Sequence, residues 1–306
     1  MANVKELRGR IKSVGNIRQI TKAMEMVASM KLRKVQAKAV ANRPYTEEIV
    51  ALIGRLADAA ASGGGPREPQ PLIEKREKKT VGLLVFTSDR GLCGAFNSNL
   101  VKAVRDHYAG LQTDSPQVKI KFYTYGRKGY SFATRRKLDV EKHFAEPPLD
   151  KADFVAAKFV TDTLVADFLA KKVDAVGIVY TQFQSQSRFV PTVAPLLPID
   201  ITPQAKESAA RDSAAAQKGY RDDYLLEPDP QTILRRLLPR YLETLVYFAI
   251  VQSLASEHAS RRMAMKGATD AANRIGKELK MEYNRARQEN ITKELLDIIG
   301  GASAVS

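Results

Sequence analysis

The sequence predicts an α/β domain set between two long terminal helices that pair with each other as an antiparallel coiled coil. The longest uninterrupted helical signal covers residues 239–299, where apolar positions recur in steps of three and four. A second long helical pattern covers residues 3–58, and short apolar strands alternate with helices between residues 80 and 200. The first helix runs into the α/β domain and the last helix runs out of it, so the two helices are antiparallel if they pair.

The first helix carries an apolar stripe that drifts along its length, as supercoiling requires. One part of the stripe holds Val4, Leu7, Ile11 and Val14, and an adjoining part holds Ile17, Ile20, Met24 and Val27. Pro44 lacks a backbone donor and crowds the preceding turn, so we expect it to bend or interrupt the helix near Asn42. The glycine- and proline-rich residues 62–71 end the helix and predict a domain boundary.

The central region predicts a layered α/β domain with mostly parallel strands. We expect strands at residues 81–87, 118–125, 138–143, 173–181 and 189–197, with helices at residues 97–108, 127–135 and 150–171. The last of these strands contains prolines, which favours a place at a sheet edge. Residues 209–216, rich in alanine and serine, predict a polar link to the last helix.

The last helix carries a narrow apolar stripe, which is typical of a coiled-coil seam. Its positions are Leu234, Leu238, Leu242, Leu245 and Ala249, followed by Ala268, Ala272, Ile275, Leu279, Tyr283 and Ala286. Proline is tolerated only in a first helical turn, so we expect this helix to start at Pro239. Small residues over 256–270, including Gly267, predict a close backbone crossing there.

Charge is concentrated on the two terminal helices. The chain of 306 residues has a formal net charge of +15, and residues 1–43 hold eleven Lys and Arg against two Glu. Residues 235–293 hold twelve basic and six acidic side chains, so the rest of the chain is neutral overall. This excess predicts an anionic partner, for which nucleic acid, acidic lipid headgroups and acidic protein loops are all candidates.

The sequence offers no pattern expected of an active site. A single cysteine and three scattered histidines exclude an internal disulfide and give no metal-ligand spacing, so we expect no metal and no cofactor. The turn Asp89–Gly94 carries glycines after a strand, but it matches neither dinucleotide-binding nor P-loop spacing, which favours a structural turn over phosphate binding. Cys93 has no histidine near it in sequence, so we expect a small buried residue. The absence of long apolar runs predicts neither a membrane span nor a secretory signal.

Five separated motifs resemble one known family over nearly the whole chain. They are ITKAMEMVA at residues 20–28, SDRGLCG at 88–94, DYLLEPDP at 223–230, MAMKGATDA at 263–271 and YNRARQENITKEL at 283–295. In this order they are similar to the gamma subunits of F-type ATP synthases. The resemblance implies a non-catalytic central-stalk rotor, with a coiled-coil helix at residues 1–60, a Rossmann-like domain at 75–205 and a second coiled-coil helix at 228–306.

The resemblance also implies a set of partners. They are the alpha and beta subunits of the catalytic head, the epsilon subunit and the membrane c-ring, with no nucleic acid and no direct insertion into the membrane. Met24, Lys266, Arg287, Gln288 and Thr292 are the residues expected to contact the head. Among them, Arg287 and Gln288 match an Arg-Gln pair of the family and are expected to hold an acidic loop.

With no transit peptide before Ala2, we expect a bacterial protein, peripheral on the cytoplasmic face of the plasma membrane. The alternative hypothesis is a basic coiled-coil protein that binds nucleic acid, supported by a sequence pI near 9.8. That hypothesis lacks aromatic side chains interleaved with the charges.

Overall fold

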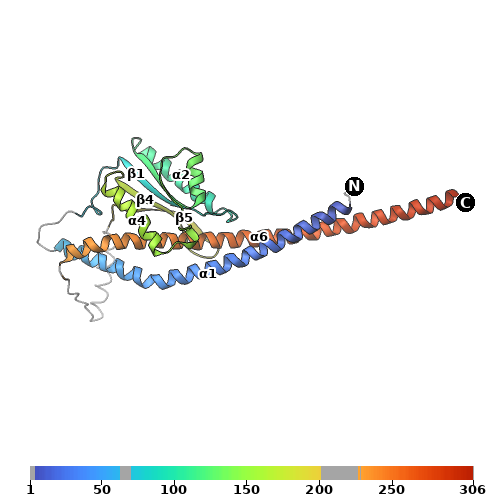
Figure 1. Cartoon of the computed structure of the whole chain (residues 1–306), viewed down its shortest axis with the longest axis horizontal. Helices are drawn as coiled ribbons and strands as arrows, with labels where there is room; N and C mark the ends of the chain where they lie inside the picture. Colours follow the sequence, from blue (N-terminus) through green and yellow to red (C-terminus); the bar gives the residue numbers. More distant parts are fainter. Residues whose placement is uncertain (1–3, 63–69, 201–226, 228, 306) are drawn as a thin grey trace. The chain divides into compact units, whose positions relative to one another are not determined.

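The computed structural model describes residues 4–62, 70–200, 227 and 229–305. The chain divides into two compact units, one of Met1–Lys31 with Arg261–Ser306 and one of Leu32–Ser260. Two long helices, α1 (Val4–Ser62) and α6 (Pro230–Val305), contribute to both units (Figure 1). None of the helices in the described residues has an apolar stretch long enough to cross a membrane. The link expected at residues 209–216 lies outside the described residues, as does most of the boundary expected at 62–71.

The larger unit contains a five-stranded sheet in the order β3-β2-β1-β4-β5. Its strands are β1 (Thr80–Phe86), β2 (Lys119–Tyr125), β3 (Val140–Phe144), β4 (Ala175–Phe183) and β5 (Phe189–Leu197). The first four are parallel, in an order that runs outward from β1 on both sides, as in the Rossmann fold. The predicted α/β fold class is therefore confirmed.

β5 pairs with β4 in the antiparallel direction and forms one edge of the sheet. Pro191 and Pro195 lie opposite Thr181 and Gly177 in this pairing. A proline has no N–H to donate to a ladder, so its place on an outer strand leaves the inner strands fully paired. The edge position predicted for this segment is confirmed.

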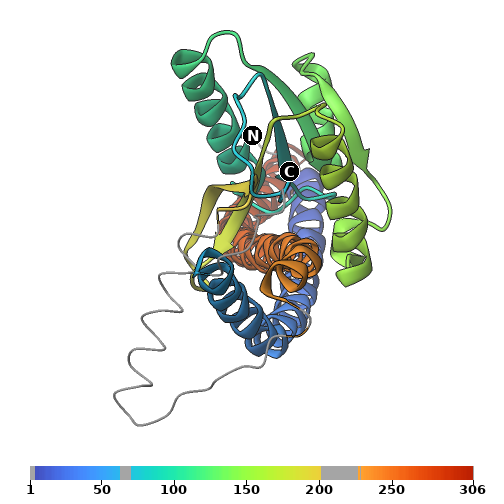
Figure 2. The same cartoon turned by 90° about the vertical axis from the view of Figure 1, so that its left-hand side faces the viewer.

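Helices cover both faces of the sheet, as Figure 2 shows for α2 (Phe96–Asp114) and α4 (Phe154–Leu169). Successive strand side chains alternate between the faces. Leu83 and Val85 of β1 join a cluster with α2, while Leu84 and Phe86 join a larger cluster with α4 and the nearby parts of α1 and α6. The remaining helices of this unit are α3 (Arg127–Arg135) and a 3-10 turn (Leu149–Lys151).

The start predicted for the last helix is wrong. α6 begins at Pro230, nine residues before Pro239, which lies inside it. The side chain of Asp229 accepts a hydrogen bond of 2.8 Å from the backbone N–H of Thr232, and this bond lowers the pKa of Asp229. A capping aspartate followed by proline is a favourable start. Pro239 has no N–H to donate to the carbonyl of Arg235, an exposed residue at which water has access to the backbone.

Pro44 does not interrupt α1, so that alternative of the prediction is wrong. The helix continues to Ser62, and Figure 1 shows it bending within its C-terminal half. The carbonyl that loses its partner belongs to Val40, whose side chain is 72% exposed, and so water reaches this turn. The carbonyl of Asn42 also accepts a hydrogen bond of 3.1 Å from the Thr46 hydroxyl.

Small residues of α6 allow a close approach to the α/β layers. The hydroxyls of Ser256 and Ser260 donate to the backbone carbonyls of Thr181, at 3.0 Å, and of Cys93, at 2.6 Å. The crossing expected at Gly267 is wrong, because Gly267 is exposed and an added Cβ would meet nothing within 4 Å. The small side chains serve contact with the sheet domain in the first part of this stretch only.

Candidate partner-binding surface

The smaller unit is an antiparallel pair formed by the first part of α1 and the second part of α6. Thr269 donates a hydrogen bond of 2.8 Å from its hydroxyl to that of Thr21. Val14 lies beside Gly276, at which a Cβ would stand 3.7 Å from a Val14 methyl. Residue numbers rise along α1 as they fall along α6, so the predicted antiparallel pairing is confirmed.

The seam of α1 keeps a seven-residue spacing through Leu7, Val14, Thr21 and Ala28, of which Val14 is half-buried and the other three are buried. The adjoining stripe predicted through Ile17 and Ile20 is wrong, since their side chains are 51% and 59% exposed. The seven-residue repeat places small side chains in the seam. The larger apolar residues lie at other positions of the repeat and therefore face outward. Sequence reasoning followed the most hydrophobic positions and missed the repeat through threonine and alanine.

Outward-facing apolar side chains are frequent on this helix pair. On α1 they are Ile17, Ile20, Met26, Val27 and Met30, and on α6 they are Met263, Ile275, Met281, Ile291, Leu295, Leu296, Ile298 and Ile299. Ile275 was predicted to lie in the seam and is 42% exposed, so that assignment is wrong. Apolar surface gathered in this way marks a site of contact with another molecule.

The same helix pair is basic. Residues 1–31 hold seven Lys and Arg against two Glu, and residues 261–306 hold nine against six acidic side chains. The unit therefore combines exposed apolar side chains with a positive field. A surface of this kind is complementary to a partner that offers apolar contact and carboxylates.

The register of the pair places Met24 level with Lys266. Val14 opposite Gly276 and Thr21 opposite Thr269 set this register. Met24 is half-buried, and Lys266 is exposed. The structure thus brings these two predicted contact residues to one level of the helix pair.

The other three predicted contact residues, Arg287, Gln288 and Thr292, lie in neighbouring turns of α6 and are all exposed. At 1.5 Å per residue they are about 30–40 Å along the helix from Lys266. The register carries them beyond the first described residue of α1, so they stand on a part of α6 with no described partner helix. Arg287 forms no ion pair with a described residue, whereas neighbouring Arg285 bonds Glu289 at 3.1 Å.

In the larger unit, the turn after β1 is tied into the fold. The carboxylate of Asp89 accepts hydrogen bonds from the backbone N–H groups of Arg127 and Leu149, both at 3.0 Å. Cys93 is buried, as predicted, and its sulfur lies 3.2 Å from the side-chain nitrogen of Asn97. These bonds give the turn a structural role.

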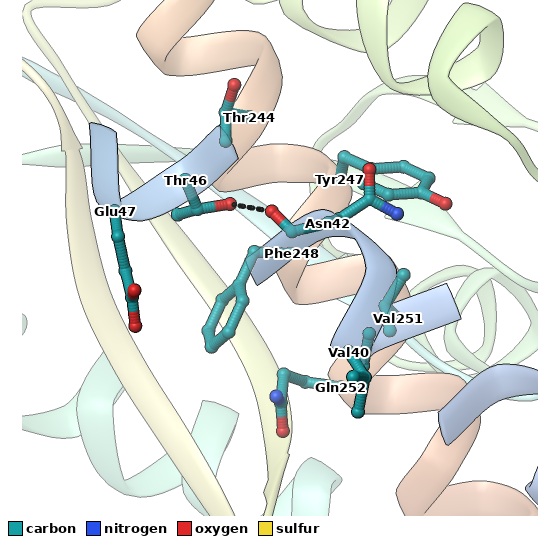
Figure 3. Close-up of a pocket in the computed structure, with 10 residues that line it drawn as sticks. Val40, Asn42, Thr46, Glu47, Thr244, Tyr247, Phe248, Val251 and Gln252 are labelled. Atoms are coloured by element: carbon teal, nitrogen blue, oxygen red, sulfur yellow. Dashed lines mark hydrogen bonds between the residues drawn. The ribbon is translucent and has the colours of Figure 1, made fainter. Parts of the chain in front are cut away.

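A groove of about 390 Å³ lies between α1 and α6 in the larger unit (Figure 3). Its lining is mainly apolar and includes Val40, Phe248 and Val251. The polar groups at the groove are already engaged: the Asn42 amide donates to a backbone carbonyl at 2.8 Å, and the Gln252 oxygen accepts from a backbone N–H at 2.9 Å. The arrangement can hold an apolar group and presents no acid-base pair.

Comparison with known proteins gives the family. A family model described as ATP synthase matches residues 3–305. The ATP synthase gamma chain of Ralstonia nicotianae is 40% identical over 308 residues, which cover 100% of both chains. The chain belongs to the ATP synthase gamma chain family. Gamma chains of Dehalococcoides mccartyi and Moorella thermoacetica are 37% and 38% identical, again over 100% of both chains.

Solved structures share the fold. A chain in the Euglena gracilis mitochondrial ATP synthase, described as OSCP/F1/c-ring, matches with a TM-score of 0.64 at 18% identity, covering 99% of this chain and 94% of that one. A chain of the Tetrahymena thermophila central stalk and c-ring matches with a TM-score of 0.54 at 22% identity, covering 81% and 99%. The predicted function as a gamma chain, a non-catalytic central-stalk subunit of ATP synthase, is confirmed at the level of the family. The nucleic-acid-binding alternative is set aside.

Proposed function

We propose that the smaller unit is the part of a rotary shaft that turns inside a catalytic head of alpha and beta subunits. The observation that carries this proposal is the exposed apolar surface of the helix pair, above all Leu295, Leu296, Ile298 and Ile299, which are each at least 54% exposed. These side chains follow helical steps of one, three and four residues, so they lie on one broad face of α6, on a part of the helix with no described partner. A subunit surrounding the shaft would bury this apolar face.

The asymmetry of the pair gives rotation its effect on the head. At the level of Met24 and Lys266 the shaft presents two described helices, whereas from Arg287 onward only α6 is described. Each of the surrounding catalytic sites therefore meets a different face as the shaft turns. Binding differences of this kind shift the populations of open and closed sites, which is how mechanical rotation couples to nucleotide binding and release.

The five predicted contact residues would meet different parts of the head, according to their positions along the helix pair. Met24 and Lys266 would meet the lower rim of the head, where a basic face attracts acidic loops of the beta subunits. Arg287, Gln288 and Thr292 would meet the head farther along the helix. The guanidinium and the amide can donate several hydrogen bonds to a carboxylate loop, and these charge-assisted bonds form only in matching rotary positions.

The proposal places the α/β unit outside the head, against the epsilon subunit and the membrane c-ring. Its support is the similarity to solved chains of ATP synthase assemblies, one of OSCP/F1/c-ring and one of a central stalk and c-ring. On this proposal the protein is peripheral on the cytoplasmic face of a bacterial plasma membrane. Ion flow through the ring would turn the subunit.

A rotation assay on the reconstituted head tests the proposal. Lys128, exposed on α3, is replaced by cysteine for attachment of a probe, and Cys93 by serine so that no other thiol reacts. With the head fixed to a surface, magnesium ATP is expected to drive stepwise rotation in one direction, and magnesium ADP is the control. An assembled complex that hydrolyses ATP while the probe stays still would refute the proposal.

A further inference from the structure

A second concave surface lies on the α/β unit, between α2 and α3. This α2–α3 groove has a volume of about 320 Å³ and is lined by three aromatic and three cationic side chains: Tyr108, Phe122, Phe132, Lys102, Arg105 and Arg136. Its lining comes from α2, from Phe122 of β2, and from Phe132 of α3 with the following positions Arg136 and Leu138. None of the five proposed contact residues of the shaft lines it.

The floor of the groove is aromatic and turned inward. The ring of Phe122 is 2% exposed and stacks on the ring of Tyr108, with centroids 6.3 Å apart. The Tyr108 hydroxyl accepts a hydrogen bond of 3.2 Å from Gln112. A side chain that entered the groove would bury apolar surface against these rings, gaining about 25 cal/mol per Å² removed from water.

The rim of the groove is positive. Lys102 and Arg136 are exposed and form no ion pair with any described residue, while Arg105 contacts Asp106 only at 3.4 Å. The segment 127–137 holds five Lys and Arg and no acidic residue. These cations surround an apolar hollow and supply an attractive field for carboxylates.

We propose that the α2–α3 groove docks an acidic segment of a protein partner, which inserts a large apolar side chain between carboxylates that face Lys102 and Arg136. The cationic rim requires a negatively charged partner segment. The aromatic lining favours an apolar side chain as the inserted group. Nucleic acid binds by stacking bases on exposed aromatic faces. A membrane surface takes protruding apolar side chains. The rings of Tyr108 and Phe132 are half-buried in the lining, so they neither lie open for stacking nor protrude toward a bilayer, whereas an apolar side chain inserted into the groove can contact them.

Binding of a synthetic peptide to the full-length chain tests the proposal. The probe is a fluorescent peptide in which a single leucine is flanked by glutamates, and its partner peptide has glycine in place of leucine. Anisotropy at low salt is expected to show saturable binding of the leucine peptide, and binding of the glycine peptide roughly tenfold weaker because the buried apolar contact is lost. Equal affinity for the two peptides would overturn the proposal.

Charge reversals on one helix locate the site. Arg136→Glu is expected to weaken the leucine peptide roughly fivefold, because an attraction becomes a repulsion. Lys128→Glu changes the net charge equally on α3 but lies outside the lining, and is expected to weaken binding less than about twofold. Both residues are exposed, so thermal melting should be unchanged in both variants. Equal losses in the two variants would refute the location.

Competition identifies the class of partner. Poly-dT and phosphatidylglycerol vesicles are added to the peptide complex at matched negative charge. Little displacement is expected, since neither places an apolar side chain in the hollow. Full displacement of the peptide by either polyanion, together with loss of that displacement in the Arg136→Glu variant, would show that the groove binds anions in general. This result would overturn the assignment to a protein segment.

Discussion

Replacing Leu296 and Ile299 by glutamine removes apolar surface from the tip of α6 while keeping good helix formers. These side chains are 63% and 64% exposed, so about two-thirds of the surface of each remains available for burial by a partner. Full burial of such a side chain stabilises by about 1.5–3 kcal/mol, and the unburied share is therefore worth about 1–2 kcal/mol each. Together the two substitutions should cost about 2–4 kcal/mol of binding, which corresponds to an affinity roughly 30- to 1,000-fold weaker.

Titration of the chain against assembled alpha and beta subunits measures that loss. The matched control replaces Asn290 and Glu294 by glutamine, two exposed polar positions in the preceding turns of α6. The control is expected to bind with nearly unchanged affinity. Circular dichroism and thermal melting of the isolated variants should match those of the parent chain, since the replaced side chains have no described contact to lose.

Two results would refute this reasoning. Equal affinity of the double variant and its control would show that the tip stays in water in the complex. A fall in the melting temperature of the isolated double variant would show that Leu296 and Ile299 already pack within the chain.

Three further expectations concern other positions. Replacing both Arg287 and Gln288 by alanine should lower ATP turnover of the reconstituted complex, because charge-assisted hydrogen bonds worth about 1.5–3 kcal/mol each are lost. The helicity of the isolated chain should not change. Unchanged turnover in a fully assembled complex would contradict the proposed bonds to an acidic loop. Burial raises the pKa of Asp167, but hydrogen bonds from its lysine and tyrosine partners outweigh burial and hold that pKa below the usual value. Asp167→Asn should therefore cost about 1–3 kcal/mol in urea unfolding at pH 7, a difference that persists above the unfolded-state pKa near 3.9 and shrinks as pH falls through the folded pKa. Gly126→Ala would place a Cβ 2.0 Å from a backbone carbonyl oxygen, at a residue whose φ is 107°, so it should lower the free energy of unfolding by about 3 kcal/mol or more. Gly91→Ala is the control: its Cβ would meet nothing within 4 Å, so thermal melting should change little.

The sheet was predictable because each strand carries its own local signal. β1 and β4 are short apolar runs between turn residues, and Pro191 and Pro195 indicate the edge position of β5.

The start of α6 was predicted wrongly because one local signal was given too much weight. Pro239 is a strong local signal for a helix start, yet a better start, Asp229 followed by Pro230, lies within the motif at 223–230. One proline inside a helix with 76 residues is tolerated where water can bond the freed carbonyl.

The contact surface was only partly predictable. The basic charge was evident in the sequence, and Arg287 and Gln288 remain predicted contact residues that rest on the family resemblance. Four of the outward apolar residues, Ile17, Ile20, Val27 and Ile275, had been assigned to the seam. Hydrophobicity alone cannot say which of two adjoining stripes faces a partner helix and which faces another subunit. The seven-residue spacing through Leu7, Thr21 and Ala28 holds the answer, since a seam keeps its spacing even where its residues are small.

In this helix pair the seam holds small and polar side chains, while large apolar side chains lie on the surface. This distribution determines what stabilises the shaft. Thr21 and Thr269 meet in the seam through hydroxyls, which fix register while contributing little apolar burial. The larger side chains Ile20 and Met30 face outward, where only another molecule can cover them. An isolated helix without tertiary packing is marginal in water. On the proposed function, contact with the surrounding subunits would supply the free energy that holds the part of α6 beyond Arg287 in one conformation, so a substitution that weakens binding to the head should also increase the mobility of this part of α6.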